Sequence, residues 1–291
     1  MNKLVIFGVG LIGGSVALAL KRQNAALHIV GVGRTGDSLQ SALNLGVINE
    51  IESDVARALV NADMVIIAVP VAQTASIFSA IAPHLEPQTT ISDVGSTKSD
   101  VIQHAQTLLG EKISQFVPGH PIAGAEKSGV TAAKADLFDG KNVVLTPTEQ
   151  TSATAVNQVS TLWQLAGAKV SEMSSEQHDS IFAAVSHLPH LLAFALVDDL
   201  AARPNAKQLF DFAASGFRDF TRIAGSSPEM WRDISLANRT ALLKELAAYQ
   251  TELSRMQILL QNSDSAGLQS LFEQASQVRN AWADNREKLQ K

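Results

Sequence analysis

The sequence begins with a glycine-rich turn between an apolar strand and a helix. The run from Leu4 to Phe7 has the composition of a strand buried on both faces, and the pattern GxGxxG follows it at Gly8–Gly13. The segment Val16–Arg22 continues with helix-compatible apolar residues and ends in two cations, which the C-terminus of a helix favours. A strand, a GxGxxG turn and a helix in this order predict a dinucleotide-binding βαβ unit.

Each glycine of the motif has a separate physical role. Gly8 permits the tight turn, Gly10 lets the backbone approach a pyrophosphate, and Gly13 lets the helix pack against the strand. The first N–H groups of the helix then face the phosphates, where the helix dipole favours negative charge. The context on both sides of the motif therefore favours a binding site over a turn that is merely rich in glycine.

The end of the second expected strand, Leu27–Val32, bears on which dinucleotide binds. An NAD site usually has an acidic side chain here for the ribose hydroxyls, but this chain has Gly33, Arg34 and Thr35. Gly33 leaves room for a 2′-phosphate, which Arg34 could pair with through its fork of donors. This favours NADP, although a surface role for Arg34 and a ribose contact from Asp37 keep NAD open.

Strands and helices alternate through the rest of the N-terminal half. The expected elements are strands at Met64–Val69, Thr89–Val94, Phe116–Gly119 and Asn142–Leu145, and helices at Val55–Val60, Gln73–Ile81, Val101–Leu109 and Ala153–Leu165. Such alternation predicts a parallel, doubly wound sheet with ligands at the carboxyl ends of its strands. The predicted cofactor-binding residues at that edge are Gly8, Gly10, Leu11, Ile12, Gly13, Gly33, Arg34, Thr35, Val69, Pro70 and Val94.

A histidine between two prolines follows one of these strands. Pro118 and Pro121 flank Gly119 and His120, and they favour an extended backbone at the histidine. The expected topology places His120 at the same edge as Gly10 and Ser96. A histidine in such a place either satisfies a turn or meets a ligand. Ser96 or Thr97 also has the side chain to cap the helix that follows.

The chain changes character near residue 170. From Ser174 onward the β-branched runs disappear and long helical patterns dominate, so we expect an α/β domain over residues 1–170 and an all-α domain over 171–291. A helix over Glu176–Leu200, with a kink near Pro189, places Asp179, Ala183, Ser186 and His190 on one stripe. The last two long amphipathic helices could form a dimer surface.

The segment Ser215–Ala224 is polar and doubly basic within an otherwise apolar region. Arg218 and Arg222 lie one helical turn apart, and Asp219 is close to both along the chain. One arginine directed inward would bind a carboxylate through two hydrogen bonds, whereas both could instead belong to surface ion pairs. Ser227 and Pro228 open another helix, with serine as its cap and proline at its first position.

Composition excludes several classes of protein. The 291 residues contain no cysteine, which excludes disulfides and thiolate chemistry, and no histidine and carboxylate set has convincing zinc spacing, so we expect no metal. A net charge of -5 without a basic block argues against nucleic acid as the main partner. We found no uninterrupted apolar run of about 18 residues and no secretory signal, so we expect a cytoplasmic protein without a membrane span.

Five motifs together resemble the prephenate and arogenate dehydrogenase family. They are FGVGLIGGS at Phe7–Ser15, DVGSTK at Asp93–Lys98, PGHPIAGAEKSG at Pro118–Gly129, SHLPH at Ser186–His190 and SGFRDFTRIA at Ser215–Ala224. The resemblance covers nearly the whole chain. It implies a Rossmann-type domain followed by a helical domain that builds a homodimer, and it implies oxidative decarboxylation of prephenate in tyrosine biosynthesis with hydride transfer to NAD or NADP.

The resemblance also implies roles for individual residues. His120 matches the catalytic histidine that contacts the 4-hydroxyl of the substrate ring, and Ser96 matches a serine at the same hydroxyl. The substrate-binding positions it implies are Glu126, Ser186, His190, Ser215, Asp219 and Arg222, with Arg222 on a substrate carboxylate and Asp219 as its orienting partner. The chain departs from the family pattern at Ala125, where members often have threonine, and at Gly33 and Arg34, where many NAD-using members carry aspartate.

Other functions stay open at this stage. Arogenate could replace prephenate or share the site with it, although His190 favours prephenate by the resemblance. β-Hydroxyacid dehydrogenases and imine reductases share the two-domain plan, but the hydroxyacid enzymes need a lysine that Glu176–Leu200 lacks. A non-catalytic NADP-binding sensor would not need His120, Ser96 and Arg222 together. We also expect neither a chorismate mutase domain before Met1 nor a regulatory domain after Lys291.

Overall fold

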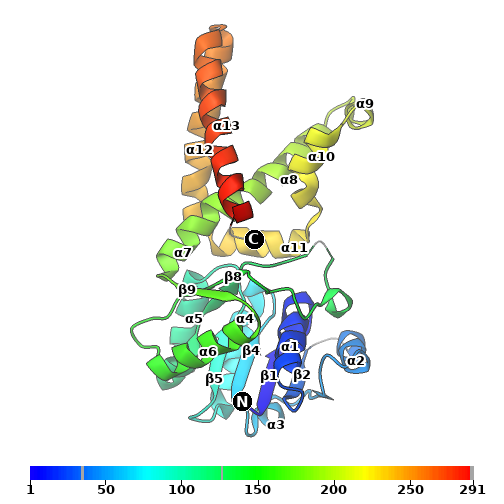
Figure 1. Cartoon of the computed structure of the whole chain (residues 1–291), viewed down its shortest axis with the longest axis vertical. Coiled ribbons are helices and arrows are strands. Elements are labelled where there is room, and N and C mark those ends of the chain that lie inside the picture. The colour runs from blue at the N-terminus through cyan, green and yellow to red at the C-terminus, as the bar shows by residue number, and fades with distance from the viewer. Residues whose placement is uncertain (34–35, 126, 289–291) are drawn as a thin grey trace. The chain divides into compact units, whose positions relative to one another are not determined.

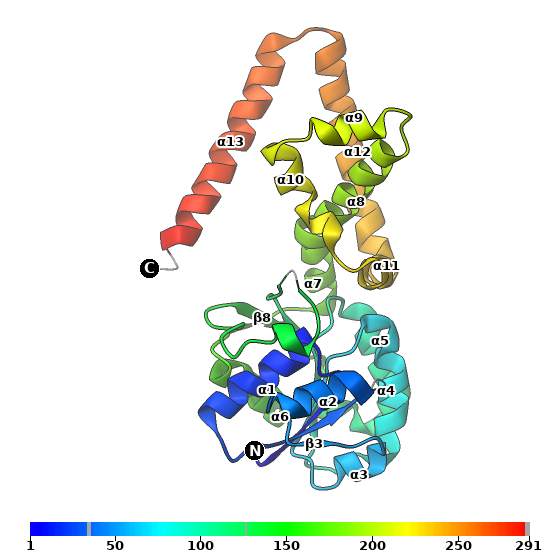
Figure 2. The ribbon, with the colours of Figure 1, turned by 90° about the vertical axis from the view of Figure 1, so that its right-hand side faces the viewer.

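The computed structural model describes residues 1–33, 36–125 and 127–288 (Figures 1 and 2). It divides into two compact units, Met1–Arg239 and Thr240–Lys291. The strands are β1 (Lys3–Phe7), β2 (His28–Val32), β3 (Glu50–Ile51), β4 (Met64–Ile67), β5 (Thr90–Asp93), β6 (Phe116–Val117), β7 (Gly119–Pro121), β8 (Asn142–Leu145) and β9 (Lys169–Glu172). The α-helices are α1 (Leu11–Gln23), α2 (Gly36–Asn44), α3 (Val55–Leu59), α4 (Thr74–Ile81), α5 (Ser99–Leu109), α6 (Ala153–Leu165), α7 (Ser175–Phe182), α8 (Leu188–Ala201), α9 (Ala206–Asp211), α10 (Ser215–Thr221), α11 (Pro228–Ala237), α12 (Arg239–Gln261) and α13 (Ser265–Lys288).

The main sheet lies in the first unit. Within the described residues it has six parallel strands in the order β3-β2-β1-β4-β5-β6. Side chains alternate between its faces, so Leu4 and Ile6 join a core with α1, α2 and α6, whereas Val5 and Phe7 join a core with α3, α4 and α5. The helices on both faces confirm the predicted doubly wound fold (Figures 1 and 2). The strand order reverses between β1 and β4, which is where such sheets bind ligands.

A second, smaller sheet changes the expected place of His120. The sequence predicts one strand over Phe116–Gly119 with His120 just beyond it, but the chain breaks at Pro118 and re-enters a strand in β7. His120 is therefore inside β7, opposite Val144 of the antiparallel strand β8. The break follows from Pro118, which has no N–H to continue the pairing of β6. The sequence reading also missed β9, which pairs parallel to β8.

The N-terminus of α5 is capped differently from the expectation. Neither Ser96 nor Thr97 caps it, because the helix begins at Ser99 after an N-cap position at Lys98 that makes no side-chain cap. The Asp179 carboxylate, from a distant part of the chain, accepts hydrogen bonds from the backbone N–H groups of Lys98 and Ser99 at 2.9 Å each. A carboxylate at this end also interacts favourably with the helix dipole.

The predicted long helix over Glu176–Leu200 is interrupted. Helix α7 passes into a π-helical turn, Ala183–His187, and then into α8. Pro189 cannot donate a backbone hydrogen bond, and its ring crowds the carbonyl four residues earlier, so a wider turn directly before it relieves both constraints. The irregularity therefore lies where the proline predicts it, in the form of a π-turn.

The stretch Ser175–Ala201 is long and apolar enough to cross a membrane if only its length and composition are considered. The buried core helix of a soluble protein meets the same criteria. In this structure its residue Asp179 bonds to the start of α5 and to Asn238 at the end of α11, so α7 is fastened to other elements of the first unit. The expected absence of a membrane span stays a prediction.

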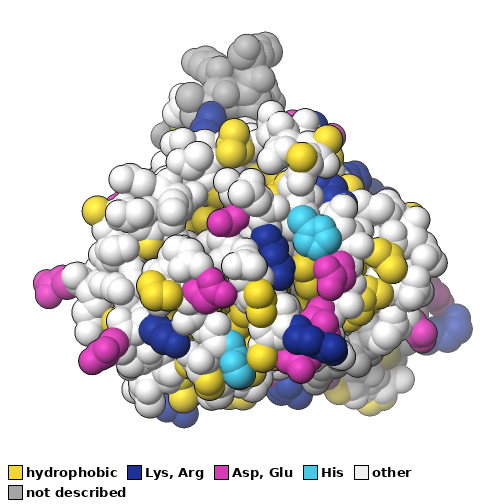
Figure 3. Space-filling view, turned by 90° about the horizontal axis from the view of Figure 1, so that it is seen from below, with side chains coloured by type: hydrophobic (Ala, Val, Ile, Leu, Met, Phe, Trp, Pro, Cys, Tyr) yellow, Lys and Arg dark blue, Asp and Glu magenta, His cyan; other side chains and the backbone are white. Residues whose placement is uncertain are grey.

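The remaining helices follow the sequence pattern closely. Ser227 caps α11 by accepting from the Met230 N–H, with Pro228 in the first turn, as predicted. Helices α12 and α13 make up most of the second unit and carry exposed apolar side chains, among them Ile258 and Trp282. At the surface shown in Figure 3, acidic and basic side chains are interspersed with uncharged ones.

Candidate active site

The glycine turn after β1 has the shape that a dinucleotide requires. Gly8 adopts φ +92°, and a Cβ there would lie 2.5 Å from the Ala68 carbonyl oxygen. A Cβ on Gly13 would lie 2.3 Å from the Gly8 oxygen, so glycine is required for this packing. A Cβ on Gly10 would meet nothing within 4 Å, which leaves open space at the N-terminus of α1. The residues present therefore fit a pyrophosphate over this helix end.

The other predicted cofactor residues gather at the same edge. Backbone hydrogen bonds join Gly8 to Val32, Ala68 to Phe7 and Val94 to Ile67, so the ends of β1, β2, β4 and β5 lie side by side. Leu11 and Ile12 form the first turn of α1, Gly33 follows β2, Val69 and Pro70 follow β4, and Val94 follows β5. Arg34 and Thr35 lie outside the described residues. The topology thus brings the described members of this set to one edge of the sheet.

A buried ion pair fixes the loop that follows β5. Lys98 is 0% exposed, and its Nζ lies 2.5 Å from Asp93 Oδ2 and donates to the Gly119 carbonyl oxygen at 2.7 Å. Asp93 also accepts from the N–H groups of Gly95 and Gly119. Ser96 lies part-buried between these anchored positions. The pair therefore ties the loop containing Ser96 to the strand that carries His120.

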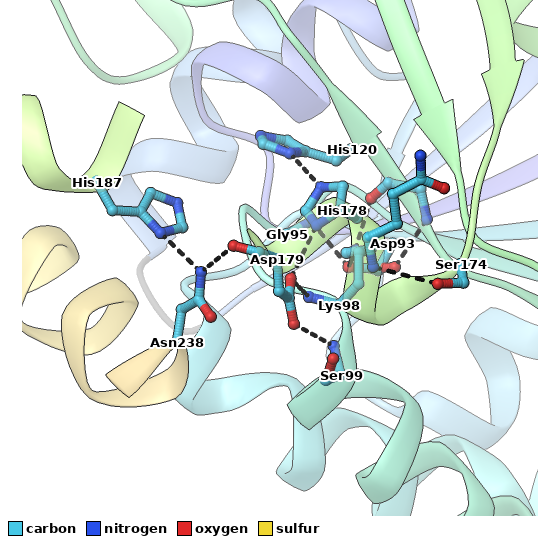
Figure 4. A network of polar contacts seen from close by, with 12 residues as sticks. Asp93, Gly95, Lys98, Ser99, His120, Ser174, His178, Asp179, His187 and Asn238 are labelled. Atoms are coloured by element: carbon cyan, nitrogen blue, oxygen red, sulfur yellow. Dashed lines mark hydrogen bonds and ion pairs between the residues drawn. The ribbon is translucent and has the colours of Figure 1, made fainter. Parts of the chain in front are cut away.

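His120 is held from one side of its ring. Its Nδ1 lies 2.8 Å from His178 Nε2 (Figure 4). The Phe182 ring packs edge-on against it at a centroid distance of 4.8 Å. Burial, together with the charges that His178, Lys98 and His187 can carry, lowers the pKa of His120 well below its ordinary value of 6.5. The imidazole is therefore neutral at neutral pH and can accept a proton.

His178 and Asp179 form the next step of this network. His178 Nδ1 lies 2.8 Å from Asp179 Oδ1, and both residues are buried. Burial acts to raise the pKa of Asp179, but hydrogen bonds from His178, Ser99 and Lys98 outweigh it, and the pKa is lowered below 3.8. Burial also lowers the pKa of His178, although the Asp179 hydrogen bond opposes this. At neutral pH the pair is thus a carboxylate beside a neutral imidazole.

A second group of side chains surrounds His190 on α8. Its Nδ1–H donates to the Ser186 carbonyl oxygen at 2.9 Å, and its ring stacks on Trp231 at 3.6 Å with an angle of 19°. Burial and the nearby charge of Arg222 lower the pKa of His190, against the effect of the Ser186 hydrogen bond. The structure therefore brings together three of the residues that the sequence singled out, Ser186, His190 and Arg222.

His187 connects the two groups. Asn238 donates from Nδ2 to the Asp179 carbonyl oxygen at 2.8 Å and to His187 Nδ1 at 3.1 Å. Burial lowers the pKa of His187 to about 4, so its ring accepts this bond in the neutral form. The His187 and His190 rings both pack on Trp231, with centroid distances of 6.0 Å and 3.6 Å.

The remaining predicted substrate residues lie on the short helix α10 and beyond it. Ser215 begins α10, and Asp219 pairs with Arg218 at 3.6 Å, both with largely exposed side chains. Arg222 begins the 3₁₀ turn Arg222–Gly225. Glu126 lies outside the described residues. The structure pairs Asp219 with Arg218, and the implied role of Asp219 as the orienting partner of Arg222 stays a prediction.

Sequence reasoning did not assign several residues of this region to the site, among them Lys98, His178, His187, Trp231 and Asn238. Lys98 and His178 had local signals, because Lys98 ends the DVGSTK motif and His178 directly precedes Asp179 on the same helix. Trp231 has its Nε1 buried without a hydrogen-bond partner among the described residues. Among those residues no group of three or more metal-ligating side chains could hold a metal ion.

Comparisons with known proteins agree with this geometry. A family model described as the nucleotide-binding domain of prephenate dehydrogenase matches residues 16–172, and one described as the dimerization domain of prephenate dehydrogenase matches residues 174–274. A prephenate dehydrogenase of Bacillus subtilis is 39% identical over 280 residues, which are 96% of this chain and 75% of that protein.

Two further relatives match this chain over almost the whole length of both proteins. A cyclohexadienyl dehydrogenase of Zymomonas mobilis is 34% identical over 95% of this chain and 94% of that protein. The structure of prephenate dehydrogenase from Aquifex aeolicus, in complex with hydroxyphenyl propionate and NAD+, superposes with a TM-score of 0.91 at 36% identity and covers 96% of this chain and 97% of that one. From its fold and from these matches, the chain belongs to the prephenate dehydrogenase family.

Proposed function

We propose that this protein oxidatively decarboxylates prephenate to 4-hydroxyphenylpyruvate, with hydride transfer to NAD(P)+, as a step of tyrosine biosynthesis. The observation that carries the proposal is His120, whose lowered pKa keeps it neutral and whose Nδ1 is engaged by His178. Its Nε2 is thereby available as a base next to the loop with Ser96. The family of the chain and its relatives of known activity support this assignment.

The proposed reaction needs one base and one hydride acceptor. A dinucleotide held by the Gly8–Gly13 turn and the N-terminus of α1 would supply the acceptor for the hydride from the substrate carbon that bears the hydroxyl. His120 Nε2 takes the hydroxyl proton as that C–O bond gains carbonyl character, and Ser96 contacts the same oxygen. The carboxylate on the opposite ring carbon leaves as CO₂, its bonding pair completes the aromatic ring, and the proton returns from His120 to the phenolate oxygen. A base of this kind accelerates a reaction by about 10² to 10⁴.

The other predicted site residues would hold the substrate. Prephenate carries two carboxylates, and Arg222 is placed beside His190 closely enough to affect its pKa. A guanidinium can bind a carboxylate with two parallel hydrogen bonds, so we assign Arg222 to the side-chain carboxylate. The remaining proposed substrate contacts are Glu126, Ser186, His190, Ser215 and Asp219.

For the cofactor we propose a preference for NADP over NAD. The support is the absence of an acidic residue directly after β2, where Gly33 is followed by Arg34 and Thr35. The relative from Aquifex aeolicus was solved with NAD+, so NAD is the alternative. The roles of Gly8, Gly10, Leu11, Ile12, Gly13, Val69, Pro70 and Val94 at the cofactor are part of this proposal.

Arogenate is the alternative substrate. It differs from prephenate in carrying an amino group in place of the side-chain keto group, and a relative named cyclohexadienyl dehydrogenase favours testing both. A hydroxyacid reductase is disfavoured because Ser175–Ala201 contains no lysine. A non-catalytic sensor would give no reason for the arrangement around His120.

The test is a set of four spectrophotometric assays that combine prephenate or arogenate with NAD+ or NADP+. We expect reduced cofactor and CO₂ in equal amounts, with the highest kcat/KM for prephenate and NADP+. A higher kcat/KM with arogenate or with NAD+ would overturn the corresponding preference. No reduced cofactor in any of the four assays would overturn the enzymatic function.

We further propose that residues 1–170 form the dinucleotide-binding domain and residues 171–291 the substrate and dimerisation domain of a cytoplasmic homodimer. The two family models meet at residues 172 and 174, close to this boundary. Exposed apolar side chains on the last two helices, such as Leu260 and Val278, supply an apolar surface for a second copy.

A further inference from the structure

Three side chains from two distant parts of the sequence form a chain of hydrogen bonds that ends at His120. Asp179 Oδ1 lies 2.8 Å from His178 Nδ1, and His178 Nε2 lies 2.8 Å from His120 Nδ1 (Figure 4). His178 is thus hydrogen-bonded through both ring nitrogens, to Asp179 through Nδ1 and to His120 through Nε2. The remaining ring nitrogen, His120 Nε2, is not part of this chain.

The direction of each hydrogen bond follows from what each group can donate. The Asp179 carboxylate is ionised and can only accept, so the proton between it and His178 sits on His178 Nδ1. A neutral imidazole with a proton on Nδ1 has a lone pair on Nε2, and His178 can therefore only accept from His120. The bond between the rings then requires a proton on His120 Nδ1, which leaves the lone pair of a neutral His120 on Nε2.

We propose that His178 and Asp179 are positioning residues that hold His120 in the tautomer with its proton on Nδ1. In this tautomer Nε2 is the base, and in the opposite tautomer Nε2 would carry a proton and could not accept one from a substrate hydroxyl. The link to catalysis rests on the proposed function, whereas the tautomer is a property of the free protein. Such control of one ring nitrogen through the other is a general feature of working histidines.

The surroundings fix Asp179 and His178 firmly enough for this task. Asp179 also accepts from the backbone N–H groups of Lys98 and Ser99, and Asn238 donates to its main-chain carbonyl oxygen. The Phe182 ring packs against both imidazoles, with centroids 4.8 Å from His120 and 4.5 Å from His178. The carboxylate is therefore held by the start of α5, and the main chain of Asp179 is held by Asn238 at the end of α11.

Burial favours the neutral form of both rings at rest, and the charged groups around them act in both directions. Lys98 and His187 act against a positive charge on His120, and Lys98 does the same on His178. Asp179 and Asp93 act in the opposite direction on His178. The carboxylates would thus stabilise the positive charge that develops when His120 takes the substrate proton, because Asp179 is connected to it through His178.

Two substitutions of His178 separate its two hydrogen bonds. In His178→Gln the amide oxygen reaches the former Nε2 position and can still accept from His120 Nδ1–H. In His178→Asn the shorter amide reaches only as far as Nδ1 did, so it can donate to Asp179 but leaves His120 without an acceptor. The two variants carry the same amide group, but the amide of His178→Gln can bond to His120 and that of His178→Asn can bond to Asp179.

The experiment measures the tautomer of His120 by ¹⁵N NMR of histidine-labelled protein, with the His120 signals assigned through His120→Asn. We expect the Nδ1–H tautomer in the parent and in His178→Gln, and loss of that preference in His178→Asn. With prephenate and cofactor, we expect kcat to fall about 10- to 100-fold in His178→Asn, to recover largely in His178→Gln, and KM for the cofactor to stay unchanged.

The outcomes distinguish this inference from the proposed function. An Nε2–H tautomer in the parent, or a His178→Asn variant with the parental tautomer and kcat, would overturn the positioning role. If the variants lose their folded circular dichroism spectrum, the parent spectrum alone decides the tautomer. If the parent shows the Nδ1–H tautomer but no turnover of prephenate or arogenate, the proposed function fails while the assignment of the tautomer stands.

Discussion

His120 and His190 are placed by different means, although both are predicted to touch the substrate. His120 lies in a strand and bonds to His178, which bonds in turn to a carboxylate anchored on a neighbouring helix. His190 bonds to the Ser186 carbonyl of its own helix and rests against Trp231. The ring that we assign to proton transfer is thus oriented by a buried polar network, whereas the ring assigned to binding is oriented by local and stacking contacts.

The same contrast extends to the segments around the two histidines. Lys98 and Asp93, which bond to Gly119 next to His120, are buried. Near Arg222 in the sequence, the Arg218 side chain is 78% exposed and Phe220 is 50% exposed. The surroundings of His120, where we place the proton transfer, are therefore buried within a single chain. Around Arg222, where we place the substrate carboxylate, apolar and charged side chains are exposed. A substrate or a second copy of the chain could bind there.

The largest effect is expected from His120→Asn. Asparagine cannot accept the hydroxyl proton as an imidazole does, so kcat with prephenate should fall by about 10² to 10⁴. The dissociation constant of the cofactor, measured by fluorescence quenching, should stay within a fewfold of the parent. A kcat of His120→Asn within a fewfold of the parent would show that His120 is not the base. The proposed difference in role between His120 and His190 would then be wrong.

The next effect concerns the buried side itself. Lys98→Met removes one partner of the Asp93–Lys98 pair and leaves a buried carboxylate without its cation, which typically costs about 3 to 5 kcal/mol. The free energy of unfolding, measured in urea at equal protein concentration, should fall by this amount.

The matched control is Lys207→Met, which breaks the exposed pair of Lys207 with Asp211 at 2.8 Å. Exposed pairs contribute little, so we expect no resolvable change in the unfolding midpoint. Equal losses in both variants would contradict the claim that the Asp93–Lys98 pair is what holds the loop after β5.

A smaller effect is expected on the open side. Arg222→Gln removes a cation that we assign to the substrate carboxylate, and a hydrogen bond to a charged group contributes about 1.5 to 3 kcal/mol. KM for prephenate should therefore rise about 10- to 100-fold, with little change in kcat, because the contact is the same in the ground state and the transition state.

Arg218→Gln is the control for this measurement. Arg218 lies one turn earlier, with its guanidinium exposed beside Asp219. We expect kinetic constants for prephenate close to those of the parent. A large rise in KM for Arg218→Gln and none for Arg222→Gln would exchange the roles of the two arginines.

Features that depend on residue type at short spacing could be predicted from the sequence. The GxGxxG turn, the alternation of apolar strands with helices, the capped start of α11 and the irregular backbone near Pro189 all rest on local chemistry, and the structure confirms them. Residues at the carboxyl ends of the strands could be grouped because a parallel sheet brings those ends together. His120 could be singled out because two prolines restrict it.

The buried network could not be predicted in the same way. His178 is 58 residues from His120, and Asp179 is 81 residues from Lys98, so their contacts depend on how α7 packs against the sheet. Ser96 and Thr97 were suitable caps for α5 by residue type, but Asp179 from α7 took that position. The break at Pro118, which moves His120 into a second sheet, also depends on a partner strand that follows later in the chain.

The pH dependence of kcat/KM for prephenate tests the central claim most directly, namely that a buried, neutral His120 is the base. Its pKa lies well below 6.5, so the active neutral form persists as the pH falls and is lost only when the pH passes through that lowered pKa. Between about pH 8 and about pH 5 we therefore expect a plateau that extends below pH 6.5 before activity declines. A decline with its midpoint at or above 6.5 would contradict the account, because it would mean that the base titrates as an ordinary exposed imidazole.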